Sequence, residues 1–187
     1  MSKLIYVNNM SLDGFIEDER GAFDFFPVDS EVFRSHTDLL QSMGTFLYGR
    51  RLYENMAVWE TDATLAAQSD LTGEFATVWQ AANKVVYSKA LSAVPTANTR
   101  IERHFDPDAV RELTTTASSD ITVGGANLAA QAFQAGLVDE CLLYVLPVVL
   151  GAGKPALPTD LRLELELIDE RRFSNGVVSL RHRPLNR

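Results

Sequence analysis

The chain has 187 residues, of which 46% are hydrophobic and 22% charged, as in an ordinary globular protein that can bury one core. Its net charge of −8 argues against a sequence-independent nucleic-acid binder, because such a protein needs a basic face to neutralise phosphates. No run of about 18 apolar residues is present and the N-terminus lacks the apolar region of a signal peptide, so neither a membrane span nor secretion is expected. The single cysteine, Cys141, lies in an apolar stretch and is expected to be a buried structural thiol in a reducing, cytoplasmic compartment.

The first half of the chain alternates short apolar segments with segments of helical spacing. A turn-rich loop that contains Asp13-Gly14 and Pro27 follows the first apolar segment. The predicted elements, in chain order, are a strand at Leu4–Val7, the loop from Asn8 to about Val28, a helix at Ser30–Leu40, a strand at Thr45–Tyr48, a helical turn at Leu52–Met56, a helix at Leu71–Ala82 and a strand at Lys84–Tyr87.

The second half continues the alternation and ends differently. The predicted elements are a strand at Thr99–Glu102, a helix at Asp108–Ala117 begun by Asp106-Pro107, a strand at Ile121–Val123, a helix that runs to Phe133 and ends at Gly136, and a long strand at Asp139–Leu150. Pro147 interrupts the long strand, which suggests a sheet edge or a bulge. Finally, Leu161, Leu163, Leu165 and Leu167 alternate with charged residues, and a turn at Ser174-Asn175-Gly176 leads to VVSLRHR, which predicts a half-buried antiparallel hairpin.

These elements predict an α/β fold with a mostly parallel sheet flanked by helices and closed by a C-terminal antiparallel hairpin. No repeat, low-complexity tract or long linker divides the sequence, so residues 1–187 are expected to form one domain.

Three of the predicted strands end directly in small or cationic residues. The segments are Gly49-Arg50-Arg51, Ser88-Lys89 and Gly124-Gly125-Ala126-Asn127. In an open α/β sheet, ligands bind beyond the carboxyl ends of parallel strands. If these strands are parallel, all three segments lie at the same edge of the sheet.

Each segment suits a different part of an anionic ligand. Gly124-Gly125 would let the backbone approach a pyrophosphate, and the helix that begins there would point free N–H groups at it. Arg50-Arg51 would supply forked donors for a terminal phosphate, and Ser88-Lys89 a hydroxyl and a point charge. Together they predict a dinucleotide with an extra phosphate, NADPH in preference to NADH. The alternative is ordinary: a glycine turn and two solvated arginines.

Four sequence segments resemble a known family over nearly the whole chain. They are Met10–Asp18 (MSLDGFIED), Phe46–Met56 (FLYGRRLYENM), Lys84–Leu91 (KVVYSKAL) and Ile121–Leu157, which runs from ITVGGANL to VLGAGKPAL. The chain resembles the dihydrofolate reductase fold and, more closely, stand-alone reductases similar to the C-terminal domain of the bacterial riboflavin-biosynthesis reductase, RibD. The resemblance implies NADPH bound along the three strand ends, including the helix start at Ala126, Asn127 and Leu128, with Ile16 near the nicotinamide.

A reductase of this kind needs one proton besides the hydride, and two carboxylates are candidates for supplying it. Asp13 belongs to the SLDG segment that the resemblance places on the substrate side, and Asp29 lies where folate reductases keep their acid. A carboxylate buried beside an apolar nicotinamide would have a raised pKa. The alternative for Asp13-Gly14 is a turn and for Asp29-Ser30 a helix N-cap.

The sequence also departs from both parent enzymes. No lysine or arginine occurs from Leu52 to Asn83, where a folate reductase clamps its substrate's glutamate tail, and Phe15 replaces a lysine common in the riboflavin enzyme. Cys141 with three scattered histidines (His36, His104, His182) makes no zinc deaminase site, and no metal is expected. The aromatic residues expected either to line a flat, neutral substrate site or to belong to the core are Phe15, Phe25, Phe26, Tyr53 and Trp59.

The sequence therefore favours an NADPH-dependent reductase that transfers hydride to a small pteridine- or pyrimidine-like heterocycle. Two alternatives stay open: a non-catalytic nucleotide- or flavin-binding protein on the same fold, and a true dihydrofolate reductase. A homodimer is expected because the VDECLLYVLPVVL stretch is more apolar than one sheet face needs and because relatives pair through this part of the sheet.

Overall fold

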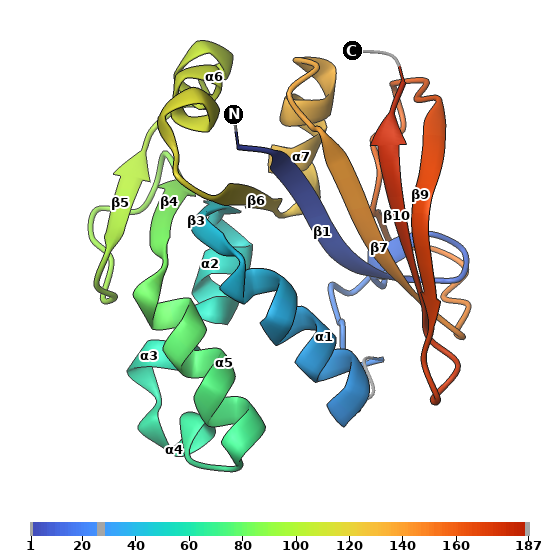
Figure 1. Cartoon of the computed structure of the whole chain (residues 1–187), viewed down its shortest axis with the longest axis horizontal. Helices are drawn as coiled ribbons and strands as arrows, with labels where there is room; N and C mark the ends of the chain where they lie inside the picture. The colour runs from blue at the N-terminus through green and yellow to red at the C-terminus, as the bar shows by residue number, and fades with distance from the viewer. Residues whose placement is uncertain (1, 26–28, 186–187) are drawn as a thin grey trace.

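A computed structural model of the chain describes residues 2–25 and 29–185. Within these residues eight strands form one sheet, in the order β5-β4-β3-β6-β1-β7-β10-β9 (Figure 1). In that order their bounds are Thr99–Glu102, Asn83–Tyr87, Met43–Gly49, Asp120–Gly124, Leu4–Ser11, Glu140–Leu146, Val178–Pro184 and Leu165–Arg172. The first six run parallel to one another, and β10 is antiparallel to both of its neighbours. The predicted α/β class, with a mostly parallel sheet and a C-terminal antiparallel pair, is confirmed.

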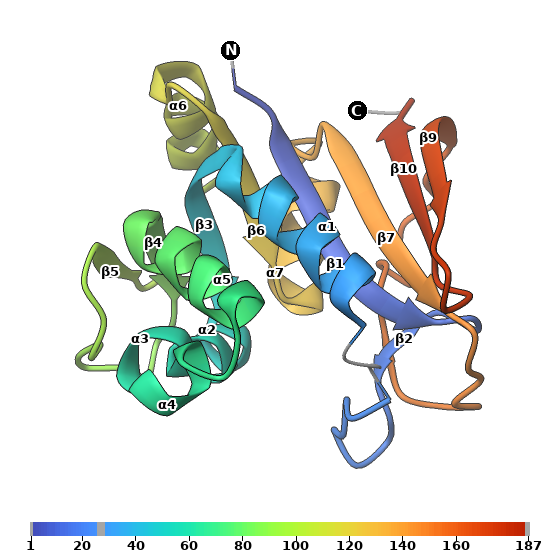
Figure 2. The same cartoon turned by 60° about the horizontal axis from the view of Figure 1, so that its bottom comes forward.

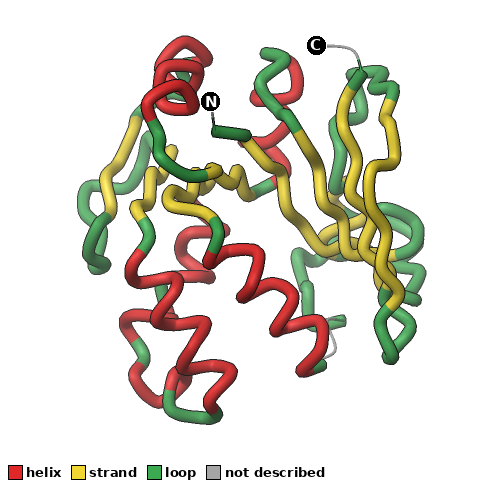
Figure 3. Tube along the Cα trace, viewed as in Figure 1, coloured by secondary structure: helices red, strands yellow, loops and turns green. Residues whose placement is uncertain are grey.

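Helices cover both faces of the parallel part of the sheet, as the red segments above and below the strands in Figure 3 show. One face carries α6 (Pro107–Thr116) and α7 (Ala126–Gln134). The other carries α1 (Ser30–Gln41), α2 (Arg50–Met56), α5 (Asp70–Ala81) and two single-turn helices that the sequence did not predict, α3 (Val58–Thr61) and α4 (Ala63–Ala66). Among the described residues, no helix combines the length and the apolar character that crossing a membrane requires.

Alternation along the central strand β1 divides the core between these two faces. Leu4 and Tyr6 pack into the cluster under α6 and α7, whereas Ile5 packs with Trp79 of α5, whose side chain is fully buried. Figure 2 shows α1 lying across β1 on this second side. Strands buried on both faces need continuous apolar sequence, which explains the short apolar runs from which they were predicted. Cys141 on β7 is also fully buried, and burial raises the pKa of its thiol to about 11, as expected of a structural cysteine.

The strand β7 corrects one expectation. It ends at Leu146, before Pro147, and lies between β1 and β10, so Pro147 marks neither a sheet edge nor a bulge. Proline cannot donate a backbone hydrogen bond, which suits the end of the strand. The apolar sequence of β7 is explained within one chain, because Leu143 packs on the α7 side and Tyr144 on the opposite side.

The C-terminal hairpin is confirmed, but its first strand is shorter at the start than predicted. β9 begins at Leu165, and Leu161 and Leu163 precede it as non-strand residues that pack against the core cluster under α6 and α7. The turn at Ser174-Asn175-Gly176 joins β9 to β10, with Gly176 at a φ of 89°.

The loop predicted from Asn8 to Val28 contains more structure than expected. β1 continues to Ser11, and a short strand β2 (Phe15–Glu17) pairs with β8 (Lys154–Pro155) in a separate two-stranded sheet. Pro27 and Val28, with the candidate aromatic Phe26, lie outside the described residues.

Candidate functional site

The three strand ends singled out from the sequence meet at one edge of the sheet. β4, β3 and β6 are neighbours in parallel register, with Gly49 opposite Tyr87 and Tyr48 opposite Gly124. A Cβ placed on Gly125 would be 3.7 Å from the Gly49 nitrogen, so the segments that follow β3 and β6 lie side by side. The expectation of a common edge is confirmed.

Each glycine of the Gly124-Gly125 pair has its own structural reason. Gly125 has a φ of 91°, a left-handed conformation that favours glycine. A side chain on Gly124 would require Leu52 to move, because a Cβ there would be 2.4 Å from Cδ2 of Leu52. The pair therefore turns the chain and packs β6 against α2, and it also leaves the start of α7 without a covering side chain.

Two helices that begin at this edge have uncapped N-termini. α2 begins after Gly49 and α7 after Gly125, and neither has a side-chain cap. In contrast, α1, α5 and α6 are capped by Asp29, Ser69 and Asp106. The first N–H groups of α2 and α7 lack capping side chains, and together with the helix dipoles they favour an anion at this place.

A cavity of about 420 Å³, the strand-end pocket, lies directly beyond these strand ends. It is lined by Gly49, Arg50, Tyr87, Ser88, Lys89, Arg103, His104, Phe105, Asn127, Leu128 and Gln131. Arg50, Lys89 and Arg103 bring three cationic side chains to it, and among the described lining residues there is no Asp or Glu. In a protein whose net charge is −8, this is a local concentration of positive charge.

Several residues of the strand-end pocket were not predicted from the sequence. Arg103 and His104 directly follow β5, the fourth parallel strand at this edge, so the rule used for the other three strand ends would have found them. An N–H of the Arg103 guanidinium donates to the Ser88 carbonyl at 2.9 Å and another hydrogen bond reaches the Leu91 carbonyl. Arg103 thus holds the segment after β4 in place beside the pocket.

Ser88 itself has a structural role that the sequence did not show. Its side chain is buried, and its Oγ accepts hydrogen bonds from the backbone N–H groups of Ala90 at 3.2 Å and Leu91 at 3.0 Å. These bonds shape the turn that presents Lys89. The hydroxyl proton of Ser88 is not consumed by them, so donation to a ligand is still possible.

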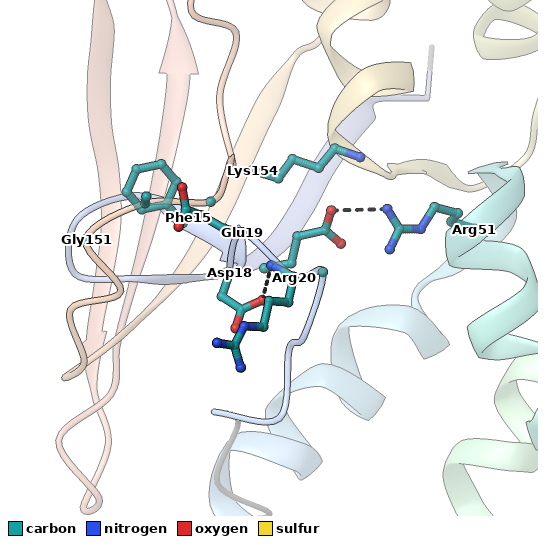
Figure 4. Close-up of a pocket in the computed structure, with 11 residues that line it drawn as sticks. Phe15, Asp18, Glu19, Arg20, Arg51, Gly151 and Lys154 are labelled. Carbon is teal, nitrogen blue, oxygen red and sulfur yellow. Dashed lines mark hydrogen bonds and ion pairs between the residues drawn. The ribbon is translucent and has the colours of Figure 1, made fainter.

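A second cavity of about 700 Å³, the loop pocket, lies between the first loop and residues 151–154 (Figure 4). It is lined by Phe15, Glu17, Asp18, Glu19, Arg20, Gly21, Arg51, Gly151, Ala152, Gly153 and Lys154. Arg51 points into this pocket and forms an ion pair with Glu17 at 3.2 Å. Arg50 lines the strand-end pocket instead, because successive residues of a helix point about 100° apart, so the structure does not support the expectation that both arginines serve one phosphate.

Asp13 and Asp29, the two candidates for the proton, both accept structural hydrogen bonds. Asp13 accepts from Ser11 Oγ at 2.6 Å and from the backbone N–H groups of Leu150 and Gly151, which ties the first loop to the loop after β7. The Ser11 hydroxyl, with help from these backbone donors, lowers the pKa of Asp13, opposite to the raised value expected. Asp29 is the N-cap of α1 and accepts from the N–H groups of Glu31 and Val32.

The remaining candidate residues fall in different places. Ile16 lies in β2, next to the loop pocket but not among its lining residues. Phe15 lines that pocket, and Phe25 is partly buried against the cluster that contains Tyr144. Neither cavity contains Gly124, Gly125 or Ala126, which form the turn and helix start behind the strand-end pocket.

Two aromatic residues that could have lined a substrate site pack in the core or against it instead. Tyr53 is 2% exposed and its hydroxyl pairs with Thr96 at 2.8 Å. Trp59 packs against the rings of Phe33 and Phe75. Both positions were predicted from residue type alone, which does not distinguish a pocket wall from a core.

A group of polar side chains that the sequence did not indicate joins α1 to the sheet. His36 Nε2 lies 2.9 Å from Oδ1 of Asn9, and the His36 ring stacks on Tyr144, whose hydroxyl pairs with Ser35 at 3.0 Å. Burial lowers the pKa of His36 to about 4. At neutral pH His36 is therefore an uncharged imidazole that fixes α1 over β1 and β7.

Six parallel strands whose ends meet ligand-sized cavities, closed by an antiparallel pair, define the dihydrofolate reductase-like fold. The chain belongs to the RibD C-terminal domain family, whose model matches residues 2–179. The resemblance found in the four sequence segments is thus confirmed.

Individual relatives agree with this assignment. The uncharacterized protein YyaP of Bacillus subtilis (strain 168) is 31% identical over 173 residues, which cover 91% of this chain and 89% of YyaP. A candidate riboflavin biosynthesis protein from Shewanella sp. PV-4 is similar in structure, with a TM-score of 0.77 and 17% identity over 98% of this chain and 99% of that one. A diaminohydroxyphosphoribosylaminopyrimidine deaminase/5-amino-6-(5-phosphoribosylamino)uracil reductase from Thermotoga maritima gives a TM-score of 0.64 at 14% identity, with 98% of this chain matching 56% of that one.

Proposed function

We propose that the protein is an NADPH-dependent reductase that transfers hydride to a small pteridine- or pyrimidine-like heterocycle. The observation that carries this proposal is the strand-end pocket, where three cationic side chains meet the uncapped starts of α2 and α7. Charged donors and helix N-termini are the groups that bind phosphates in dinucleotide sites. The similar Thermotoga protein is named as a 5-amino-6-(5-phosphoribosylamino)uracil reductase, which supports a pyrimidine-like substrate.

The proposed arrangement gives each part of NADPH a place. The phosphate that distinguishes NADPH from NADH would be held by Arg50, Lys89 and Arg103 in the strand-end pocket. The pyrophosphate would pass the N-termini of α7 and α2, where Gly49 and Gly125 allow close approach of the backbone. Bound NADPH supplies the hydride, and the protein's part is to orient it and keep water away.

A cytoplasmic location is part of the proposal, on the ground of the buried thiol of Cys141.

The test compares NADPH with NADH in thermal unfolding, because a ligand that binds only the folded state stabilises it by RT ln(1 + [L]/Kd). We expect NADPH to raise the melting temperature well beyond NADH. The variant Arg50→Ala should weaken NADPH binding about 10-fold or more, because a charged hydrogen bond is lost, and should leave NADH nearly unchanged. Arg162→Ala, which removes an exposed arginine paired with Glu164, is the control. Equal shifts for both cofactors in the wild type would overturn the phosphate assignment.

A non-catalytic nucleotide-binding protein is the second candidate, and one observation favours it: both Asp13 and Asp29 are engaged in structural hydrogen bonds. Consumption of NADPH with a riboflavin-pathway pyrimidine or with dihydrofolate distinguishes the two candidates. Binding of NADPH with no turnover of either substrate class would favour the binder.

A further inference from the structure

Arg51 lies beside the proposed cofactor path, and its guanidinium is engaged in an ion pair with Glu17. Arg51 follows Arg50 at the start of α2, so adjacent residues face the strand-end pocket and the loop pocket. The dashed line to Arg51 in Figure 4 marks its contact with the first loop, at 3.2 Å between the guanidinium and the Glu17 carboxylate. The guanidinium also lies close to Gly21, where an added Cβ would be 3.1 Å from Nη2 of Arg51.

The exposure of the two partners is unequal. The Arg51 side chain is 60% exposed and that of Glu17 is 15% exposed. The guanidinium is therefore open to a second anion from solvent, whereas the carboxylate is held mostly inside the loop pocket. A ligand phosphate can approach Arg51 from its open side and compete with Glu17 for the same donors.

The backbone of Glu17 is fixed, so an exchange at Arg51 needs only a side-chain rotation. Glu17 pairs with Lys154 between β2 and β8, and a Cβ added to Gly153 would be only 2.0 Å from the Glu17 carbonyl oxygen. Asp13, bonded to Leu150 and Gly151, anchors the other end of the same loop. The loop is thus held at two places that do not involve Arg51.

The charges of the loop pocket balance only while the Glu17 carboxylate is present. Among the described lining residues, the carboxylates are Glu17, Asp18 and Glu19, and the cations are Arg20, Arg51 and Lys154. If Glu17 rotates away from Arg51, or is made neutral, the side of the pocket next to α2 becomes net positive.

We propose that the Glu17 carboxylate is an internal stand-in for a ligand diphosphate at Arg51, and that the cofactor displaces it on binding. This inference rests on the proposed function, since it assumes a dinucleotide that extends from the strand-end pocket past Arg51. Glu17 lowers the affinity for the cofactor and couples its binding to the first loop, which covers the loop pocket.

The experiment measures dissociation constants by isothermal titration calorimetry on the full chain at low salt, with Glu17→Gln and its control Glu19→Gln. Both variants remove one negative charge from the same pocket, but only Glu17 pairs with Arg51. We expect Glu17→Gln to bind NADPH about 2- to 5-fold more tightly than the wild type, the range set by an exposed ion pair, and the gain to shrink at high salt. Glu19→Gln should bind as the wild type does.

Adenosine 2′-monophosphate serves as the second probe, because it carries the extra phosphate of NADPH but neither phosphate of the diphosphate that the proposal places at Arg51. Its affinity should be the same in the wild type and in Glu17→Gln. The proposal is overturned if Glu17→Gln fails to bind NADPH more tightly than the wild type, or if it binds adenosine 2′-monophosphate more tightly by the same factor. Glu17→Ala provides a second variant with the same expected direction.

Inorganic pyrophosphate separates this proposal from the function on which it rests. If the wild type does not bind NADPH, the proposed cofactor is wrong, but pyrophosphate still probes Arg51. Tighter binding of pyrophosphate by Glu17→Gln than by the wild type then supports the exchange. Equal affinity in both proteins, or binding to neither, overturns it.

Discussion

At the scale of single residues, the same charged side chain can serve the fold or a ligand, and the structure separates these roles. Asp13 and Asp29 are the clearest cases, since each accepts hydrogen bonds that hold a loop or begin a helix. The lowered pKa of Asp13 favours its charged form, which accepts hydrogen bonds but cannot donate a proton near neutral pH. Whether either residue supplies the proton stays a prediction.

The proton role of Asp13 and Asp29 can be tested by replacing each with Asn. If a carboxylate supplies the proton, its Asn variant loses kcat by a factor of about 100 or more and loses the corresponding limb of the pH–rate profile. If the role is structural, the melting temperature falls while the shape of the pH profile is retained. Kinetics over a pH series, together with thermal unfolding of the same samples, decide between these outcomes.

His36 makes a prediction about stability rather than catalysis. Burial lowers its pKa to about 4, below the ordinary value of 6.5, so the folded state binds fewer protons than the unfolded state between these values. The contribution of neutral His36 is fully present above pH 6.5 and is lost as the pH falls toward 4. We expect His36→Phe, which keeps a ring against Tyr144, to flatten this part of the pH dependence. Urea unfolding of both proteins at a series of pH values measures it, and parallel curves would contradict it.

At the scale of secondary-structure elements, the site depends on how β6 passes into α7. Gly125 provides a left-handed turn, and Gly124 allows Leu52 of α2 to pack against the strand. The uncapped start of α7 results from this turn, because the N-cap position has no side chain that could accept a hydrogen bond. Structural and ligand-binding explanations of the two glycines are thus compatible.

The variant Gly125→Ala should destabilise the protein by about 1–2 kcal/mol, because an L-residue is strained at positive φ. Added bulk is not the cause, since its Cβ would meet no atom closer than 3.7 Å. Gly49→Ala is the matched control: Gly49 also precedes an uncapped helix, but its φ is −69° and an added Cβ would contact only Leu128, at 4.0 Å. Chemical unfolding of the three proteins measures the difference, and equal losses for both variants would refute the account of Gly125.

At the scale of the whole molecule, the common edge of the strand ends could be predicted because each of the three strands is a short apolar run followed by glycine or serine, with a cation next in two of the three. Arg103 and His104 follow a strand whose end at Glu102 was predicted correctly, but β5 (TRIE) has only one apolar residue and was not counted among the apolar strands that end in cations. The separation of Arg50 from Arg51 follows from α2 beginning at Arg50, two residues before the predicted helical turn, because successive helical residues point about 100° apart. The ion pair of Arg51 with Glu17 joins residues 34 positions apart and has no local signal.

The apolar sequence of β7 was recognised correctly, but it reflects burial inside one chain and not a surface that pairs with a second chain. It suggested a surface for a second copy of the chain, but β7 is an internal strand with Leu143 and Tyr144 packed on opposite sides. The run is accounted for within one chain. A homodimer therefore stays a prediction without that support.

A crystal structure of the protein with NADPH bound is the most direct measurement of the cofactor site. We predict that the phosphate on the adenosine ribose lies within hydrogen-bond distance of Arg50 and Lys89, and that the pyrophosphate lies at the starts of α2 and α7. The nicotinamide should point toward the first loop. Electron density for NADPH at any other face of the sheet, or a phosphate that avoids both cations, would contradict the proposed site and the reductase function built on it.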